Sequence, residues 1–141
     1  MSERTALITG VTGQDGSYLA ELLLEKGYTV YGLVRRVSQP SLGRNLINHL
    51  MSNEKFHLLN GDLTDQNSID NAVHQVKPDD FYNLGAMSFV PESWRIPMMT
   101  ADITGLGALR CLEALRKHSP NCRFYQAGSS EQYGKVKQVP Q

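Results

Sequence analysis

The apolar positions of the chain switch repeatedly between continuous runs and helical spacing. Residues 5–9 form a continuous, mostly apolar run, as in a parallel strand that is covered on both faces. Leu19, Leu22 and Leu23 then fall at i, i+3 and i+4, which predicts the buried face of a helix. Gly27 comes next, and we expect it to end this helix in the left-handed conformation common at that position.

The same alternation continues along the rest of the chain. Further strands are predicted at residues 29–34, 56–59, 80–84 and 123–127. Helices are predicted at residues 46–51, 68–76 and about 98–117. The apolar stripe of the last helix is expected to consist of Ile103, Leu106, Leu109, Leu112 and Leu115. Strands and helices that alternate with short connections imply an α/β fold with a parallel sheet and right-handed crossovers.

A glycine-rich turn separates the first predicted strand from the first predicted helix. Gly10, Gly13 and Gly16 are spaced for a tight turn, a close backbone approach to a diphosphate and close packing of helix on strand. The N–H groups and the positive dipole end of the helix then attract phosphate. An ordinary glycine-rich turn is the alternative, but the flanking strand and helix favour a dinucleotide site. The other residues assigned to this site are Thr12, Gln14 and Asp15.

The turn and the alternation together predict a Rossmann-type doubly wound parallel sheet. The expected strand order is 3-2-1-4-5, with a ligand crevice beyond the carboxyl ends of strands one and four. Such folds usually continue past a fifth strand. We therefore expect residues 1–141 to be the N-terminal NADP-binding domain of a longer enzyme, cut after the fifth strand.

Composition narrows the range of functions. The chain has 141 residues, 40% of them hydrophobic, which suits one core. Lys plus Arg and Asp plus Glu number 14 each, so no net field attracts nucleic acid or an anionic membrane. Without a signal peptide or an apolar run of ~20 residues, a cytoplasmic protein is expected. Cys111 and Cys122 are interpreted as buried thiols, and the histidines lack metal-ligand spacing.

The end of the second predicted strand indicates which dinucleotide is bound. An NAD site places a carboxylate there for the ribose 2′-hydroxyl, whereas this chain has Arg35 and Arg36, with Ser38 close behind. Guanidinium groups pair with a 2′-phosphate that a carboxylate would repel. The alternative is a solvated basic loop. NADP is the predicted cofactor.

Two further segments come after strands three and four. The Asp62 carboxylate can accept from an adenine amine while Leu63 lies against the ring; a turn or a helix N-cap explains this pair equally well. After strand four, small residues and a hydroxyl allow close approach to the nicotinamide ribose, although a tight turn is as good an explanation. That segment comprises Leu84, Gly85, Ala86, Met87 and Ser88.

A hydroxyl and a carboxylate come after the fifth predicted strand. Ser129 can hydrogen-bond a reacting sugar hydroxyl, and Glu131 can remove or return a proton beside a carbonyl. The alternative is a serine-rich helix N-cap with a glutamate in the first turn.

Taken together, these segments resemble the extended short-chain dehydrogenase/reductase family and, within it, the branch of GDP-mannose 4,6-dehydratases. The resemblance covers the whole chain, and its most specific features are the Gly-Gln-Asp-Gly-Ser turn and the paired arginines. It implies GDP-mannose as substrate, a homo-oligomer at full length, and NADP bound at Gly10, Gly13, Asp15, Arg35, Arg36, Asp62, Leu63 and residues 84–88. It also implies a hydro-lyase: a hydride leaves sugar C4, Glu131 takes the C5 proton, water leaves C6, and the hydride returns to C6.

The sequence departs from this pattern in several places. Gly128 and Ser129 stand where the family pattern has Ser and Thr. Ser129 therefore keeps a hydroxyl but lacks the methyl group that restricts the rotamer of threonine. Met87 replaces Gln, and Met99 a common Tyr. The family's Tyr-x-x-x-Lys pair is expected beyond Gln141, so the chain should bind cofactor better than it turns over substrate. Another NADP-dependent nucleotide-sugar epimerase or reductase, or a non-catalytic dinucleotide-binding module, remains an alternative.

Overall fold

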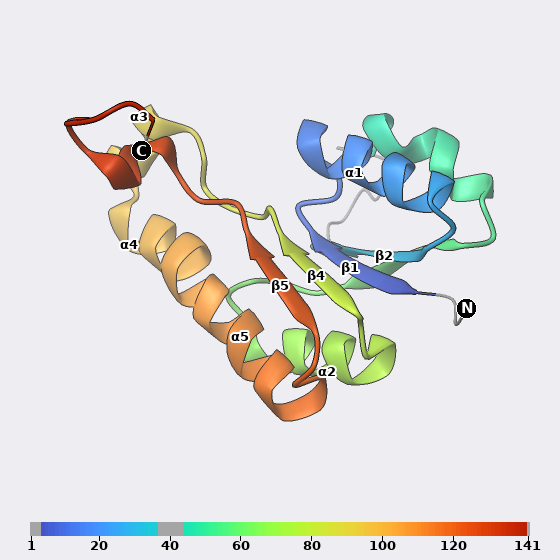
Figure 1. Cartoon of the computed structure of the whole chain (residues 1–141). Coiled ribbons are helices and arrows are strands. Elements are labelled where there is room, and N and C mark those ends of the chain that lie inside the picture. The colour runs from blue at the N-terminus through green and yellow to red at the C-terminus, as the bar shows by residue number, and fades with distance from the viewer. Residues whose placement is uncertain (1–3, 37–43, 141) are drawn as a thin grey trace.

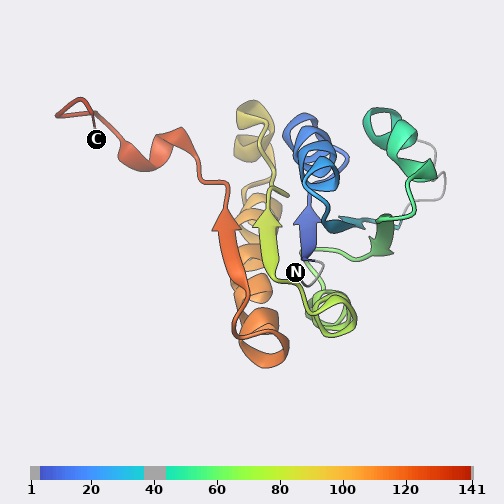
Figure 2. The same ribbon diagram turned by 45° about the vertical axis from the view of Figure 1, so that its right-hand side comes forward.

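The computed structural model describes residues 4–36 and 44–140, which form one parallel sheet with helices on both faces. The strand order β3-β2-β1-β4-β5 is the predicted one, and all four strand pairs are parallel. Figure 2 shows this plainly for β1, β4 and β5. The strands are β1 (Thr5–Thr9), β2 (Thr29–Val34), β3 (Phe56–Asn60), β4 (Asp80–Asn83) and β5 (Arg123–Gln126). The predicted doubly wound α/β fold is therefore confirmed.

Each face of the sheet has its own core. On one face, α1 (Gln14–Glu25) and the 3₁₀ helix η1 (Asn45–Ser52) cover residues such as Ile8 and Val30. On the other face, α2 (Gln66–Val76) and α5 (Gly107–His118) cover residues such as Phe81. The two layers lie above and below the strands in Figure 1. Because both faces are covered, the inner positions of β1, Ala6, Leu7 and Ile8, are all apolar and fully buried, as its sequence indicates.

The buried face of α1 differs in part from the predicted one. Leu23 is buried and Leu19 packs against the core, but 46% of Leu22 is exposed. The helix instead approaches the sheet through Gly16, Ser17 and Ala20, because small residues let its first turns lie close to β1. Gly27 adopts the predicted left-handed conformation, with φ of +84°.

The helix predicted at about residues 98–117 is confirmed in extent, because helical backbone runs without a break from Pro97 to His118, but a π-helical segment lies within it and its buried face differs from the predicted one. The chain forms α3 (Val90–Arg95), α4 (Pro97–Thr100), a π-helical turn η2 (Ala101–Leu106) and then α5. The proposed stripe fails, since Leu106, Leu109 and Leu112 are exposed. Steps of three residues turn about 300°, so successive positions fall about 60° behind and leave one face. The buried face of α5 consists of Gly107, Cys111, Ala114 and Leu115.

Smaller corrections concern element ends. α2 begins at Gln66, two residues before the predicted start, because Asp65 caps it by accepting a hydrogen bond from the Asn67 N–H at 3.0 Å. β4 and β5 each end one residue earlier than predicted.

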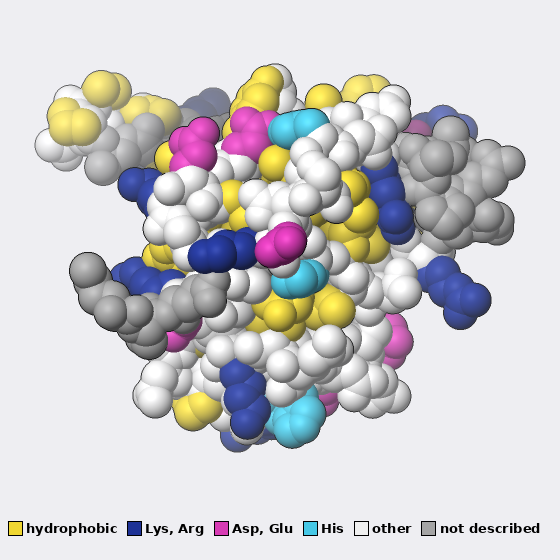
Figure 3. Space-filling model, turned by 90° about the vertical axis from the view of Figure 1, so that its right-hand side faces the viewer, with side chains coloured by type: hydrophobic (Ala, Val, Ile, Leu, Met, Phe, Trp, Pro, Cys, Tyr) yellow, Lys and Arg dark blue, Asp and Glu magenta, His cyan; other side chains and the backbone are white. Residues whose placement is uncertain are grey.

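On the face seen in Figure 3, basic and acidic side chains are interspersed and form no single-sign patch. In the described part of the chain, no helix combines the length and apolarity needed to cross a membrane.

Candidate functional site

Two adjoining cavities lie at the carboxyl ends of the strands. The smaller, of about 330 Å³, runs from the ends of β1 and β2 to the segment after β4. The larger, of about 900 Å³, reaches α3, η2 and the segment after β5. Both volumes are in the range of small-molecule sites. The cavities form one crevice because they share Gly10, Gly13, Leu84, Ala86, Met87 and Ser88.

The glycine-rich turn forms the floor of this crevice. Gly10 has φ of +69°, and a Cβ there would stand 2.8 Å from the Gly85 backbone nitrogen. A Cβ on Gly16 would stand 2.7 Å from the Cα of Val11 and closer still to the Gly10 carbonyl oxygen. The turn is closed by the Gly13 N–H, which donates to the Gly10 carbonyl at 3.0 Å. The backbone therefore takes a path that only glycine permits at these positions.

The start of α1 adjoins the larger cavity, which Gln14, Asp15 and Gly16 help to line. No side chain among the described residues caps this helix. Its first N–H groups and its positive dipole end can therefore bind an anion. Thr12 lines the smaller cavity.

A hydrogen-bonded chain of side chains fixes the backbone beside the turn. The Thr9 hydroxyl accepts from the N–H groups of Leu84 and Gly85, at 3.1 and 2.9 Å, and donates to Asn83 Oδ1 at 2.5 Å. Asn83 Nδ2 then donates to Gln126 Oε1 at 2.8 Å. Thr9, Asn83 and Gln126 are opposite one another in the sheet register. This network was not predicted from the sequence, although each of the three strands ends on a polar residue, which was a signal.

The two predicted arginines differ in their position relative to the crevice. Both arginines are exposed and come directly after β2. Arg35 lines the smaller cavity, whereas the described lining of neither cavity includes Arg36. Ser38 lies outside the described residues.

Asp62 and Leu63 both line the smaller cavity. Asp62 Oδ1 accepts from the Thr64 N–H at 2.9 Å and from the Thr64 hydroxyl at 2.8 Å. This is a side-chain turn, and the helix cap of the alternative interpretation is provided by Asp65 instead. A carboxylate has two oxygens with several lone pairs, so the turn leaves acceptor capacity for a ligand.

The segment after β4 is held from two sides. Thr9 binds its first N–H groups, and the Thr104 hydroxyl accepts from the Met87 N–H at 3.1 Å. All of residues 84–88 line the crevice. Thr104 and Ile103 also line it, and sequence analysis did not identify them, because they enter the crevice from the π-helical turn η2.

The segment after β5 enters the larger cavity in part. Ser129 lines it together with Gln14 and Ser88. Glu131 belongs to the 3₁₀ helix η3 (Ser130–Tyr133), and its side chain lies outside what the structure describes. Tyr133 and Lys137 have Tyr-x-x-x-Lys spacing, but they line a separate cavity of about 470 Å³, which explains why this pair is unsuitable for the crevice.

The cysteines and histidines form no further reactive centre in the described ranges. Burial raises the pKa of the Cys111 thiol to about 12 and that of the half-buried Cys122 thiol to about 12. Both are therefore protonated thiols at neutral pH and poor nucleophiles. Within residues 4–36 and 44–140, no group of three His, Cys, Asp or Glu side chains is arranged to hold a metal ion.

Comparison with known proteins gives a consistent set of relatives. The family model described as "GDP-mannose 4,6 dehydratase" matches residues 7–141. A GDP-mannose 4,6 dehydratase of Cricetulus griseus is 49% identical over 146 aligned residues, covering 98% of this chain and 39% of that protein. The Homo sapiens enzyme of the same name is also 49% identical, with 96% and 38% covered. The chain thus spans about two fifths of the length of these curated relatives.

Solved structures agree on the fold. The Bordetella bronchiseptica enzyme WbmH, determined in complex with NAD⁺, superposes with a TM-score of 0.79 at 24% identity, covering 99% of this chain and 44% of WbmH. With a family match that runs from β1 to the last residue, the chain belongs to the GDP-mannose 4,6-dehydratase family.

Proposed function

We propose that the crevice binds a nicotinamide dinucleotide, with its diphosphate over the glycine-rich turn. The observation that carries this proposal is the steric one: a Cβ at Gly10 or Gly16 would collide with backbone, so the turn is built for close approach. The residues proposed to hold the diphosphate also include Thr12, Gly13, Gln14 and Asp15. Asp62 and Leu63 would hold the adenine, and residues 84–88 the nicotinamide ribose. Residues 1–141 would then be a dinucleotide-binding domain.

NADP is the proposed form of the cofactor. Arg35 lines the smaller cavity directly after β2, where its guanidinium can pair with a 2′-phosphate. Arg36 and Ser38 are proposed to assist it.

Replacing Arg35 by glutamate should reverse this preference, because a carboxylate repels the 2′-phosphate and accepts from a 2′-hydroxyl. We expect NADPH to bind at least about tenfold more weakly, the effect of 1.4 kcal/mol in binding free energy. Titration of nicotinamide fluorescence with NADPH and NADH measures this. Lys26→Glu makes the same charge change at the other end of α1 and should leave both affinities unchanged. An unchanged ratio in Arg35→Glu would remove the arginine assignment.

The full-length protein is proposed to convert GDP-mannose to GDP-4-keto-6-deoxymannose, a step in nucleotide-sugar metabolism. The cofactor, held over the glycine-rich turn and residues 84–88, would supply a hydride acceptor for sugar C4 and a hydride donor for C6. Ser129, which lines the larger cavity, would hydrogen-bond the reacting sugar hydroxyl. Glu131 would remove the C5 proton, made acidic by the neighbouring C4 carbonyl, so that water can leave C6.

The test of this activity is Glu131→Gln in the full-length protein. Loss of a general base costs about 10²–10⁴-fold in rate, so formation of the 6-deoxy product should fall by that factor. Oxidation at C4 should persist and be visible as reduced nicotinamide fluorescence. If Glu131→Gln left turnover intact, an epimerase or reductase, which needs no such base, would be the better assignment.

A further inference from the structure

Arg110, on α5, is hydrogen-bonded to two segments that form the crevice, although the residue itself does not line either cavity. Arg110 Nη1 donates to the Leu63 carbonyl at 2.9 Å and to the Asp102 carbonyl at 3.1 Å. Its Nη2 donates to Asp102 Oδ1 at 2.7 Å, and only 20% of the Arg110 side chain is exposed. A partly buried, charge-assisted set of this kind is stronger than an exposed ion pair.

The acceptors belong to segments that form the crevice. Leu63 lines the smaller cavity, beside the position proposed for adenine. Asp102 lies in the π-helical turn η2, whose next residues, Ile103 and Thr104, line the smaller and the larger cavity. Thr104 also accepts the hydrogen bond from Met87, after β4. Arg110 therefore connects the adenine wall to the wall that holds the segment after β4.

The fit around Leu63 is tight enough for small displacements to matter. A Cβ on Gly85 would stand 2.9 Å from Leu63 Cδ1, and a Cβ on Gly107 would stand 3.0 Å from Leu63 Cβ. Leu63 thus packs between Gly85, in the segment after β4, and Gly107, at the start of α5, and the Arg110 hydrogen bond fixes its carbonyl. A π-helical turn is irregular and often marks a functional site. Here the Arg110 guanidinium binds both the carbonyl and the carboxylate of Asp102, near the start of the turn.

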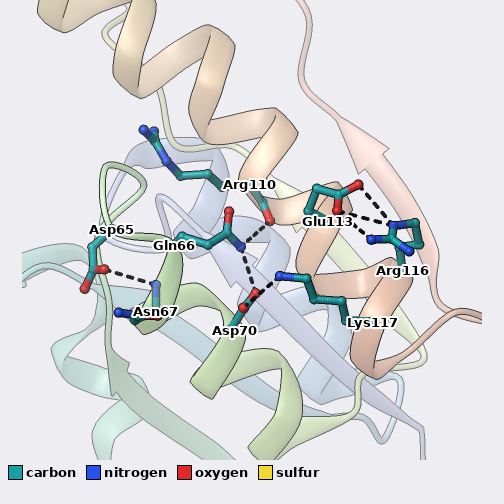
Figure 4. Close-up of polar contacts among 8 residues, drawn as sticks. All are labelled: Asp65, Gln66, Asn67, Asp70, Arg110, Glu113, Arg116 and Lys117. Carbon is teal, nitrogen blue, oxygen red and sulfur yellow. Dashed lines mark hydrogen bonds and ion pairs between the residues drawn. The ribbon is translucent and has the colours of Figure 1, made fainter.

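Figure 4 shows that Arg110 differs from the other basic residues of α5. Its side chain points away from the surface pair of Glu113 and Arg116, and its carbonyl accepts a hydrogen bond from Gln66 Nε2 at 3.2 Å. Arg116, by contrast, is bound to Glu113 one turn away and is 68% exposed. The two arginines make a matched pair, one tied to the crevice and one on the surface.

We propose that Arg110 is a positioning residue for the dinucleotide site: it holds Leu63 and the π-helical turn at the spacing that the bound cofactor requires. The inference rests on the proposed function of the crevice and adds a residue that does not touch the ligand. Arginine suits the role because its planar fork reaches several acceptors at once, whereas a lysine ammonium is a point charge on a flexible stem.

The experiment compares NADPH affinity, by nicotinamide fluorescence, in Arg110→Met, Arg110→Lys and Arg116→Met, with the unfolding midpoint in urea measured for each. Residues without ligand contact alter binding by roughly 2- to 30-fold. We expect Arg110→Met to bind about tenfold more weakly and Arg110→Lys to recover part of the loss, while Arg116→Met binds like the unmodified chain.

Stability is separated from positioning by a further control. Arg123 pairs with the buried Asp80 at 2.6 Å, at the opposite end of the strands. Arg123→Met should lower the urea midpoint and leave the affinity of the folded protein unchanged. If Arg110→Met is too unstable to titrate, Arg110→Lys decides the question, and an affinity equal to that of the unmodified chain overturns the inference.

The outcomes distinguish this inference from the function on which it rests. If the unmodified chain binds NADPH and Arg110→Met binds it with equal affinity, the positioning role alone is overturned. If the unmodified chain binds neither NADPH nor NADH, both the positioning role and the proposed function of the crevice are overturned. The proposal is supported if NADPH affinity falls in the Arg110 variants and stays unchanged in Arg116→Met and Arg123→Met.

Discussion

Gly16→Ala is expected to abolish NADPH binding and to destabilise the fold by about 4 kcal/mol or more, the range reached by severe backbone or core disruption. The added methyl would meet the backbone of Gly10 and Val11, which cannot move aside as a flexible side chain can. Either α1 separates from β1 or the turn opens, and both changes displace the diphosphate cradle. Urea unfolding and NADPH titration of the same preparation measure the two effects.

A matched control lies in the π-helical turn. A Cβ on Gly105 meets nothing within 4 Å, and alanine is the better helix former. Gly105→Ala should therefore change the free energy of unfolding by no more than about 1 kcal/mol, in the stabilising direction. If Gly16→Ala behaved like Gly105→Ala in both measurements, the steric account of the turn would be wrong.

Thr9→Val is expected to lower the free energy of unfolding by about 3 kcal/mol, since a buried polar group without its partner costs about 1–3 kcal/mol. Valine has the shape of threonine, but it leaves the N–H groups of Leu84 and Gly85 and the Asn83 Oδ1 without the hydroxyl that binds them. Because Leu84 and Gly85 line the crevice, NADPH affinity should fall as well.

Thr9→Ser keeps the hydroxyl and tests whether the hydrogen bonds, rather than the shape, matter. We expect it to cost about 1 kcal/mol for the lost methyl and to retain most of the NADPH affinity. Equal stability of the valine and serine variants would contradict the role given to the Thr9 hydroxyl.

The fold was predictable from sequence because strand and helix periods differ and the apolar runs are well separated. The strand order and the end of α1 at Gly27 were confirmed. The helix predicted at residues 98–117 was confirmed in extent, but its apolar stripe was wrong. A π-helical turn adds no signal to an apolar pattern and shifts the register of the next helix, α5. Propensity also cannot show that α1 packs through small residues such as Ala20, leaving Leu22 exposed.

The candidate site was predictable where a single segment supplies the geometry. The glycine-rich turn and residues 84–88 come together in one crevice. Contacts between distant segments were not predictable. Arg110 is 47 residues from Leu63, and Thr9 is 74 residues from Asn83. Only the folded sheet and the packing of α5 bring these partners within hydrogen-bond distance.

The most direct test of the central claim is a titration of the unmodified chain with NADPH and with NADH, following nicotinamide fluorescence. The account predicts that both bind in the crevice and that NADPH binds at least about tenfold more tightly, a difference of 1.4 kcal/mol. Equal affinities would retain the glycine-rich cradle and contradict the role of Arg35. Binding of neither nucleotide would contradict the claim that this crevice is a dinucleotide site.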